Sequence, residues 1–221
     1  MNGKDRVDRD CIMQIFGANF NAFHHMSGEM IRKIAYHEVG HFIVQKFSDK
    51  LIDRKAVAIS IVPAEGYLGI TVTDIMDNTI SRDRSYLLDL IAVSLAGRTS
   101  EKVFLSSEND VGAEDDLEKA TKIAFDMVTK FGMNSKFGEK HVYLNEKNYQ
   151  MQTPSVTEMV NGEVKKIMEE AEERAKTILM QHSKLAEALV NELSKKGMLR
   201  DKEIEVIVKR IEPESSEVIK D

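Results

Sequence analysis

Two histidines one helical turn apart, with a glutamate beside the first, are the side chains of this sequence best suited to chemistry. They are His37, Glu38 and His41, in the pattern H-E-x-x-H. Residues four apart on an α-helix lie on the same face, so both imidazoles can bind one metal ion. In zinc peptidases with this pattern the glutamate stays off the metal and acts as a general base on water. The motif therefore predicts a zinc site with Glu38 as the catalytic base.

The residues around the motif predict the helix that such a site requires. Ser27 is a candidate N-cap, and Glu29 falls in the first turn, where the helix dipole favours a carboxylate. Apolar residues recur at helical spacing on the face that carries His37 and His41. Gly40 costs a helix interior about 1 kcal/mol relative to alanine. That cost indicates a close approach to the helix backbone by a strand, a substrate or another packed element.

A catalytic zinc site needs a third protein ligand, and the motif alone does not supply one. The metzincin continuation fails, because Val44 and Phe47 stand where that pattern has glycine and histidine. Glu101, in a downstream helical pattern, is one remaining source. The acidic segment 106–116 is the other, although carboxylates at a helix N-terminus usually serve as caps and dipole partners. Composition does not choose between these two sources.

Two β-rich segments follow the motif helix. Residues 56–62 and 67–73 each predict a strand, and the turn residues 63–66 between them predict a hairpin. An exposed strand edge can hold a peptide in an extended conformation through backbone hydrogen bonds. Leu68, Gly69 and Ile70 are therefore the candidate substrate-binding residues.

Helical periodicity dominates the rest of the chain. Helices are predicted at residues 86–104, 117–128, 155–182, 185–195 and 201–211. The fold class we expect is mainly α (α+β), with a small hairpin or sheet beside the H-E-x-x-H helix and a C-terminal helical bundle. The expected organisation is an N-terminal extension at 1–26, a domain at 27–211 whose helical C-terminal part starts near 155, and a polar tail at 212–221.

Composition limits the classes of protein to consider. The chain has 221 residues, 42% hydrophobic and 31% charged, and a net charge of −6, which argues against a general nucleic-acid binder. It has one cysteine, Cys11, so no internal disulfide forms, in agreement with a reducing compartment. No segment is long and apolar enough to predict a membrane span. We expect a cytoplasmic location, or one at the cytosolic face of a membrane through a partner or a region outside this chain.

Several short segments, in a fixed order, resemble the peptidase domain of the FtsH-type AAA zinc metalloproteases. The segments are residues 35–41, 61–63, 68–69, 96–98, 112–121 and 127–133, and the resemblance runs from about residue 31 to about residue 208. It implies that Asp116, the aspartate just before Leu117, completes a Zn2+ site with His37 and His41. Glu101 then supports the site without binding the metal.

The resemblance also implies an activity and partners. A family member of this type is a zinc metalloendopeptidase that hydrolyses unfolded polypeptides, and its peptidase domains assemble as a homo-hexamer. These 221 residues contain no G-x-x-x-x-G-K-[ST] motif, so we expect this chain to lack an ATPase module of its own. An AAA ATPase would then act in trans or lie in a region outside this chain. Two alternatives are a non-catalytic FtsH-like assembly module and a stand-alone oligopeptidase.

Overall fold

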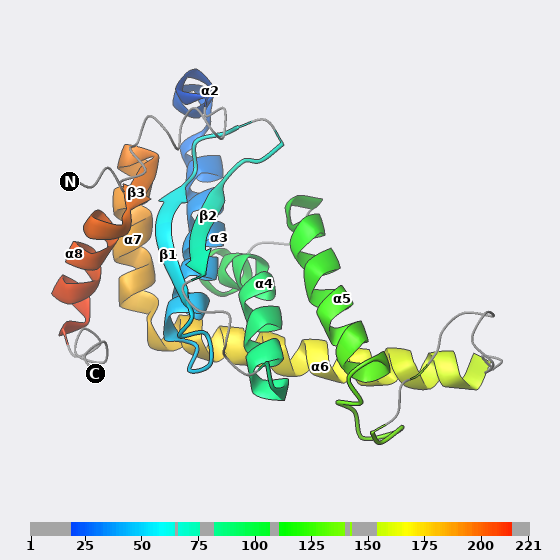
Figure 1. The fold of residues 1–221 in the computed structure, drawn as a ribbon. Coiled ribbons are helices and arrows are strands. Elements are labelled where there is room, and N and C mark those ends of the chain that lie inside the picture. The colour runs from blue at the N-terminus through cyan, green and yellow to red at the C-terminus, as the bar shows by residue number, and fades with distance from the viewer. Residues whose placement is uncertain are drawn as a thin grey trace, which may run out of the picture.

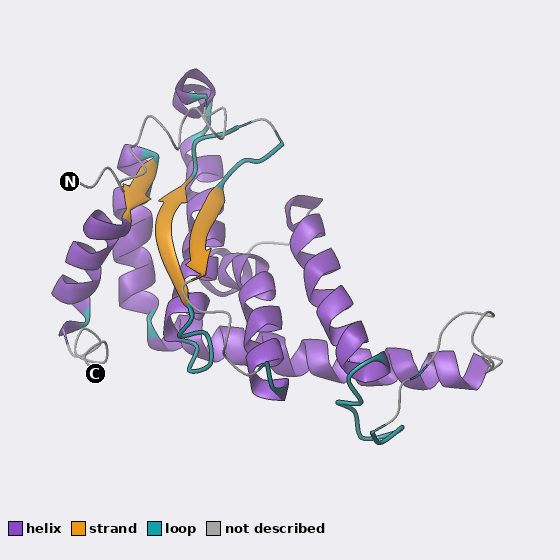
Figure 2. Ribbon diagram, in the orientation of Figure 1, coloured by secondary structure: helices purple, strands orange, loops and turns teal. Residues whose placement is uncertain are grey.

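The computed structural model describes residues 19–64, 66–75, 82–106, 111–139, 142 and 154–213. Helices predominate in this part of the chain, beside one small sheet (Figures 1 and 2), so the expected mainly α fold is confirmed. In chain order the elements are α2 (Phe20–His25), α3 (Gly28–Phe47), β1 (Arg54–Ser60), β2 (Ile70–Ile75), α4 (Arg84–Leu105), the 3-10 turn η1 (Val111–Ala113), α5 (Glu114–Thr129), α6 (Pro154–Gln181), α7 (Ser183–Lys196), β3 (Met198–Arg200) and α8 (Asp201–Ile211).

Helix α3 carries the H-E-x-x-H motif and begins as its sequence predicts. The Ser27 side chain accepts a hydrogen bond from the backbone N–H of Met30 at 3.2 Å, and Glu29 lies in the first turn. Gly40 shows why this helix tolerates a glycine. A Cβ at that position would lie 2.6 Å from both the Ala96 carbonyl oxygen and the Ser100 Cβ. The element that approaches the backbone of α3 is therefore helix α4, not a strand or a substrate.

The sheet is antiparallel, with the strand order β2-β1-β3. The predicted hairpin is present as β1 and β2, but β1 begins two residues before its predicted start and β2 three residues after, which leaves Leu68 and Gly69 outside the strand. The pairing register shifts between Ala56 and Ala58. Strand β3 pairs with the other side of β1 and was not predicted, because three residues are too few to show an alternation. Helix α3 lies against β1 and β2 (Figure 1). Strand β2 is thus an edge strand beside the motif helix.

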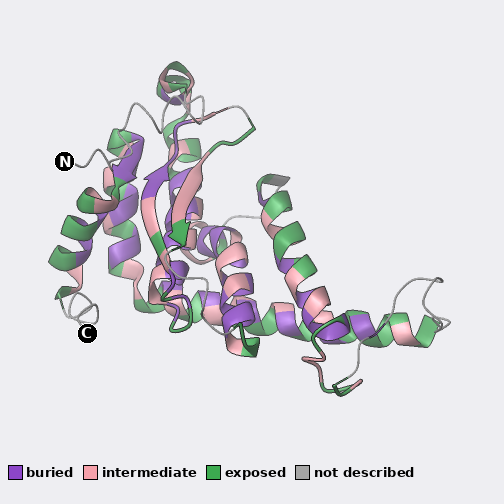
Figure 3. Cartoon of the chain, in the orientation of Figure 1, coloured by how far each residue is buried: buried purple, intermediate pink, exposed green. Residues whose placement is uncertain are grey.

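Helix α6 runs along the base of α3, α4 and α5, and these helices stand on it (Figure 1). Ala171 and Ala175 on α6 are fully buried, and such small side chains let helix backbones come close. Buried residues concentrate where α4 meets α6 and where α7 lies near the sheet, whereas much of α8 is exposed (Figure 3). The core therefore joins the motif helix to the C-terminal helices. No described helix has both the length and the apolar character needed to cross a membrane.

Helix α2 lies within the segment that the sequence suggested as an N-terminal extension. Phe23 on α2 is only 5% exposed and belongs to the main hydrophobic core. The backbone N–H of Asn19 donates to the carbonyl of Pro63 at 2.7 Å, which attaches this segment beside the end of the hairpin strand β1. The described part of the extension, from residue 19, thus packs on the helical domain.

Glu163 on α6 fixes the segment that follows α5, and this contact gives a testable pH dependence. Lys166 lies 2.6 Å from its carboxylate, and Ser135 donates from its N–H at 3.0 Å and its hydroxyl at 2.9 Å. These donors lower the pKa of Glu163 to about 2 from an ordinary 4.5. The carboxylate therefore stabilises the fold above about pH 4.5, and this contribution is lost as the pH falls toward 2.

We expect Glu163→Gln to lower the free energy of unfolding at pH 7 by about 1–2 kcal/mol, the scale of a hydrogen bond to a charged group. The difference in the free energy of unfolding between this variant and the unmodified protein should become smaller as the pH falls below 4.5. Urea unfolding at pH 7 and pH 3 measures both effects. Glu158→Gln, at an exposed position on the same helix, is the matched control. If Glu163→Gln lowered the free energy of unfolding by the same amount at pH 7 and pH 3, the expected role of the Glu163 charge would be contradicted.

Candidate metal centre

Three side chains from two helices converge near the middle of the motif helix. The Nε2 atoms of His37 and His41, on α3, lie 3.3 and 3.1 Å from Asp116 Oδ2, on α5. The candidate ligand atoms of the three residues all lie within 4.8 Å of one another. Asp116 is 75 residues beyond His41 in the sequence, so only the fold brings it to the histidines. The structure thus places Asp116, and not Glu101, on the Nε2 side of both imidazoles.

Helix α5 presents Asp116 from its first turn. The helix begins at Glu114, three residues before the predicted start, and its first turn holds Glu114, Asp115 and Asp116. A carboxylate there is favoured by the helix dipole, and that role alone would explain the acidic sequence. Asp116 differs from its neighbours because it is half-buried and directed at the two imidazoles, whereas Glu114 and Asp115 are exposed.

Helix α4 contacts the other nitrogen of each imidazole. His37 Nδ1 lies 2.6 Å from Glu101 Oε1, and His41 Nδ1 lies 2.7 Å from the carbonyl oxygen of Val93. Both partners accept, so each Nδ1 donates a proton to α4, and Nε2 is the ring nitrogen that faces Asp116. Asp126, a carboxylate on α5, pairs with Lys130 at 2.8 Å. The Val93 carbonyl could not be found from the sequence, because a backbone acceptor has no residue signature.

These contacts give an expected result for Glu101. Replacing it with glutamine removes the charge that orients and polarises His37 but keeps the shape of the side chain. We expect Glu101→Gln to weaken zinc binding by about 10-fold or more. Competition with a chromogenic chelator measures this affinity. Glu118→Gln, an exposed site two residues from Asp116, controls for the loss of one negative charge near the centre. Equal affinities in the two variants would contradict the orienting role of Glu101.

The electrostatics of the centre favour a bound cation. Burial lowers the pKa of His37, but hydrogen bonds to Asp116 and Glu101 outweigh it and raise that pKa to about 10. Burial also opposes ionisation of Asp116, yet the two histidines hold the pKa of this carboxyl well below its usual range. Burial raises the pKa of Glu38, and both histidines oppose that rise. His37 and the Asp116 carboxylate therefore form a place that attracts positive charge, either a proton or a metal ion.

The donor set and the space around it fit a zinc ion. Two imidazoles and one carboxylate are ligands that zinc prefers, and three protein ligands leave a fourth position for water or substrate. Gly97 on α4 leaves room where the ring nitrogens meet. A Cβ there would lie 2.5 Å from His37 Nε2 and 2.6 Å from His41 Nε2. The sequence signal for this role of Gly97 is a glycine inside a helical pattern. Because glycine destabilises a helix interior, its presence there usually has a packing or functional reason.

Glu38 is not among the three converging residues. It is only 7% exposed, and the segment that leads into β2 covers it. A Cβ on Gly69 would lie 2.7 Å from Glu38 Oε1, so the backbone there approaches the carboxylate closely. Leu68, beside Gly69, is exposed, and Ile70 starts the edge strand. The fold thus brings Gly69, the middle one of the three suggested substrate-binding residues, next to Glu38.

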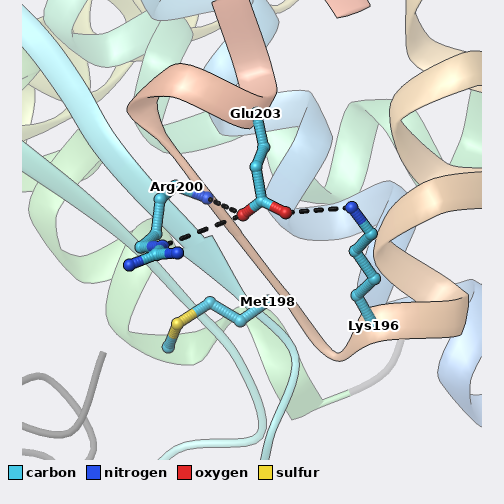
Figure 4. Close-up of a pocket in the computed structure, with 4 residues that line it drawn as sticks. All are labelled: Lys196, Met198, Arg200 and Glu203. Atoms are coloured by element: carbon cyan, nitrogen blue, oxygen red, sulfur yellow. Dashed lines mark hydrogen bonds and ion pairs between the residues drawn. The ribbon is translucent and has the colours of Figure 1, made fainter. Parts of the chain in front are cut away.

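A separate pocket of about 350 Å³ lies where α7, β3 and α8 meet (Figure 4). It is lined by Lys196, Met198, Arg200 and Glu203, none of which belongs to the metal centre. Glu203 accepts from Lys196 Nζ at 2.9 Å and from the Arg200 N–H at 3.2 Å. These contacts cap the first turn of α8. The charged groups of this pocket are thus paired with one another and stabilise the fold.

Comparison with known proteins finds matches that cover most of this chain. The sequence profile of peptidase family M41 matches residues 24–207. The chain is 33% identical over 224 aligned residues to the ATP-dependent zinc metalloprotease FtsH of Pseudothermotoga lettingae, with 94% of this chain and 35% of the relative covered. It is 30% identical over 187 residues to the mitochondrial inner membrane m-AAA protease component yta12 of Schizosaccharomyces pombe, with 83% of this chain and 24% of the relative covered.

The FtsH of Nitrosococcus oceani gives a similar result, with 31% identity over 194 residues and 30% of the relative covered. The chain thus spans about a third or less of the length of these curated relatives. The matched region includes both histidines, Glu38 and Asp116. On the extent of this match, the chain belongs to peptidase family M41.

Proposed function

We propose that this chain is the catalytic part of an FtsH-type zinc metalloendopeptidase that hydrolyses unfolded polypeptides. The observation that carries the proposal is the convergence of His37, His41 and Asp116, with Glu38 beside them. The three residues would hold the zinc ion. When bound, zinc lowers the pKa of a water ligand and polarises a peptide carbonyl.

Glu38 supplies the proton transfers in this proposal. A carboxylate next to the ligands can take the proton from the attacking water and then give it to the amine that leaves. Its burial supports this role, because burial raises the pKa of Glu38 and makes the carboxylate a stronger base than an exposed glutamate. His37 and His41 hold the reaction centre in place through the contacts of their Nδ1 atoms with α4.

The edge strand β2 is the proposed place for the substrate backbone. Its inner side pairs with β1, and no other described strand pairs with its outer side. A peptide can add to such an edge in an extended conformation, which requires that the peptide be unfolded. Ile70 begins this edge, and Leu68 and Gly69 come directly before it, with Gly69 next to Glu38. This placement would bring a peptide bond to the metal centre.

The wider setting is part of the same proposal. Folded substrates would need an AAA ATPase, acting in trans or joined to this chain, and the relatives that match are named as ATP-dependent proteases. A homo-hexamer is the proposed assembly, in the cytoplasm or at the cytosolic face of a membrane. The net charge of −6 supports no role for nucleic acid.

An unstructured polypeptide substrate tests the chemistry without a motor. The zinc-loaded protein should cleave a fluorescently labelled, unstructured polypeptide in the absence of ATP. A chelator should abolish the cleavage, and stoichiometric zinc should restore it. Cleavage of short peptides alone would support the stand-alone oligopeptidase. A zinc-loaded oligomer, identified by gel filtration, that cleaves neither substrate would support the non-catalytic assembly module.

A further inference from the structure

One side chain of β2 reaches the proposed catalytic base directly. Thr71 Oγ1 lies 2.9 Å from Glu38 Oε2 and 3.1 Å from the Glu38 backbone carbonyl oxygen. Both oxygens are acceptors, so the threonine hydroxyl is the donor and is shared between them. We propose that Thr71 is a positioning residue that holds the Glu38 carboxylate in its reactive orientation. The proposal rests on the proposed function, in which Glu38 is the general base.

The contact matters because a glutamate side chain is long and flexible. If the carboxylate samples several orientations, it spends less time in the one that faces the reacting water, and the rate of proton transfer falls. Thr71 restrains one carboxylate oxygen, and the backbone at Gly69 covers the other. A Cβ at Gly69 would lie 2.7 Å from Glu38 Oε1 and 2.8 Å from its Cγ. Two positions on one segment thus confine the carboxylate from different sides.

The same hydroxyl also ties the strand to the helix at this residue. Its second acceptor, the Glu38 carbonyl, belongs to the backbone of α3. The hydrogen bond therefore links the base, the motif helix and the edge strand at one point. Because Leu68, Gly69 and Ile70 precede Thr71 directly in the sequence, the proposed substrate edge and the base are held in a fixed relation.

The chain contains a matched control for a purely structural role. Thr73 lies two residues further along β2, and its hydroxyl donates to Gln45 Oε1 on α3 at 2.8 Å. Gln45 is buried, as Glu38 is. Both threonines thus join the same strand to the same helix through one hydroxyl, but only Thr71 contacts a group of the metal centre. A valine at either site removes the hydroxyl and keeps a β-branched side chain suited to a strand.

Steady-state kinetics on the zinc-loaded protein compares these variants. We expect Thr71→Val to lower kcat by about 10-fold or more, with KM changed by less than about twofold and one zinc still bound per chain. Thr71→Ser keeps the hydroxyl and should recover most of the lost rate. Thr73→Val leaves the hydroxyl contact with Glu38 intact and should lower kcat far less than Thr71→Val does. Equal kcat values in Thr71→Val and Thr73→Val would overturn the proposal.

A crystallographic comparison separates this proposal from the proposed function. In Thr71→Val the Glu38 carboxylate should leave its position or occupy several rotamers, and in Thr73→Val it should not move. If the unmodified protein cleaves no substrate, the proposed function fails. The position of the Glu38 carboxylate in the electron density of the two variants still tests the positioning role of Thr71. An unmoved Glu38 carboxylate in Thr71→Val would overturn that role whatever the activity.

Discussion

Replacing Glu38 with glutamine is expected to lower kcat for peptide cleavage by about 10²–10⁴-fold, the usual contribution of a positioned general base. Glutamine has nearly the same shape and can still accept the hydrogen bond from Thr71, which lies 2.9 Å from Glu38 Oε2. It cannot take a proton from water at neutral pH. Glu38 is not one of the three converging ligands, so the variant should keep one zinc ion per chain.

Two measurements make this result specific. Zinc content by atomic absorption should match that of the unmodified protein, and so should the affinity in a chelator competition. The fold should also survive, because a neutral amide removes the cost of burying a carboxylate that is only 7% exposed. Glu29→Gln, at an exposed position in the first turn of the same helix, is the matched control and should keep full activity. Undiminished cleavage by Glu38→Gln would remove Glu38 from the mechanism.

The centre could be predicted from the sequence to the extent that its residues lie close together along the chain. His37, Glu38 and His41 follow from spacing within one helix turn, and Ser27 marks where that helix begins. The third converging residue is different, because Asp116 reaches the histidines only through the packing of α5 against α4. The sequence pattern alone did not decide whether Glu101 or the acidic segment 106–116 supplies the third ligand. The resemblance to a family favoured Asp116, and the geometry places Glu101 on the opposite nitrogen of His37.

Other features had no sequence signal of sufficient strength. The carbonyl of Val93 could belong to any residue type, so its contact with His41 becomes visible only when α4 lies beside α3. Strand β3 has three residues and exists because β1 offers it an edge. The start of α5 was placed three residues too late, because acidic residues are common in loops as well as in first helical turns. For Val93 and β3 a tertiary contact, and not a local preference, decides the structure.

Replacing Gly97 with alanine is expected to weaken zinc binding by about 10–100-fold, and activity at limiting zinc should fall with it. The added Cβ would lie 2.5 Å from His37 Nε2 and 2.6 Å from His41 Nε2, well inside contact distance. Both imidazoles, or helix α4 itself, must then shift, and the shift occurs where the ligands converge. The helix should remain folded, because alanine is more favourable than glycine in a helix interior by about 1 kcal/mol.

Gly162 provides the matched control for this substitution. It lies in α6, and a Cβ there would meet no atom within 4 Å. Gly162→Ala should therefore leave zinc affinity unchanged and raise the free energy of unfolding by about 0.5–1 kcal/mol. Chelator competition and urea unfolding on both variants separate the two effects. If Gly97→Ala bound zinc as tightly as the unmodified protein, the Nε2 atoms of His37 and His41 would not both be the ligands.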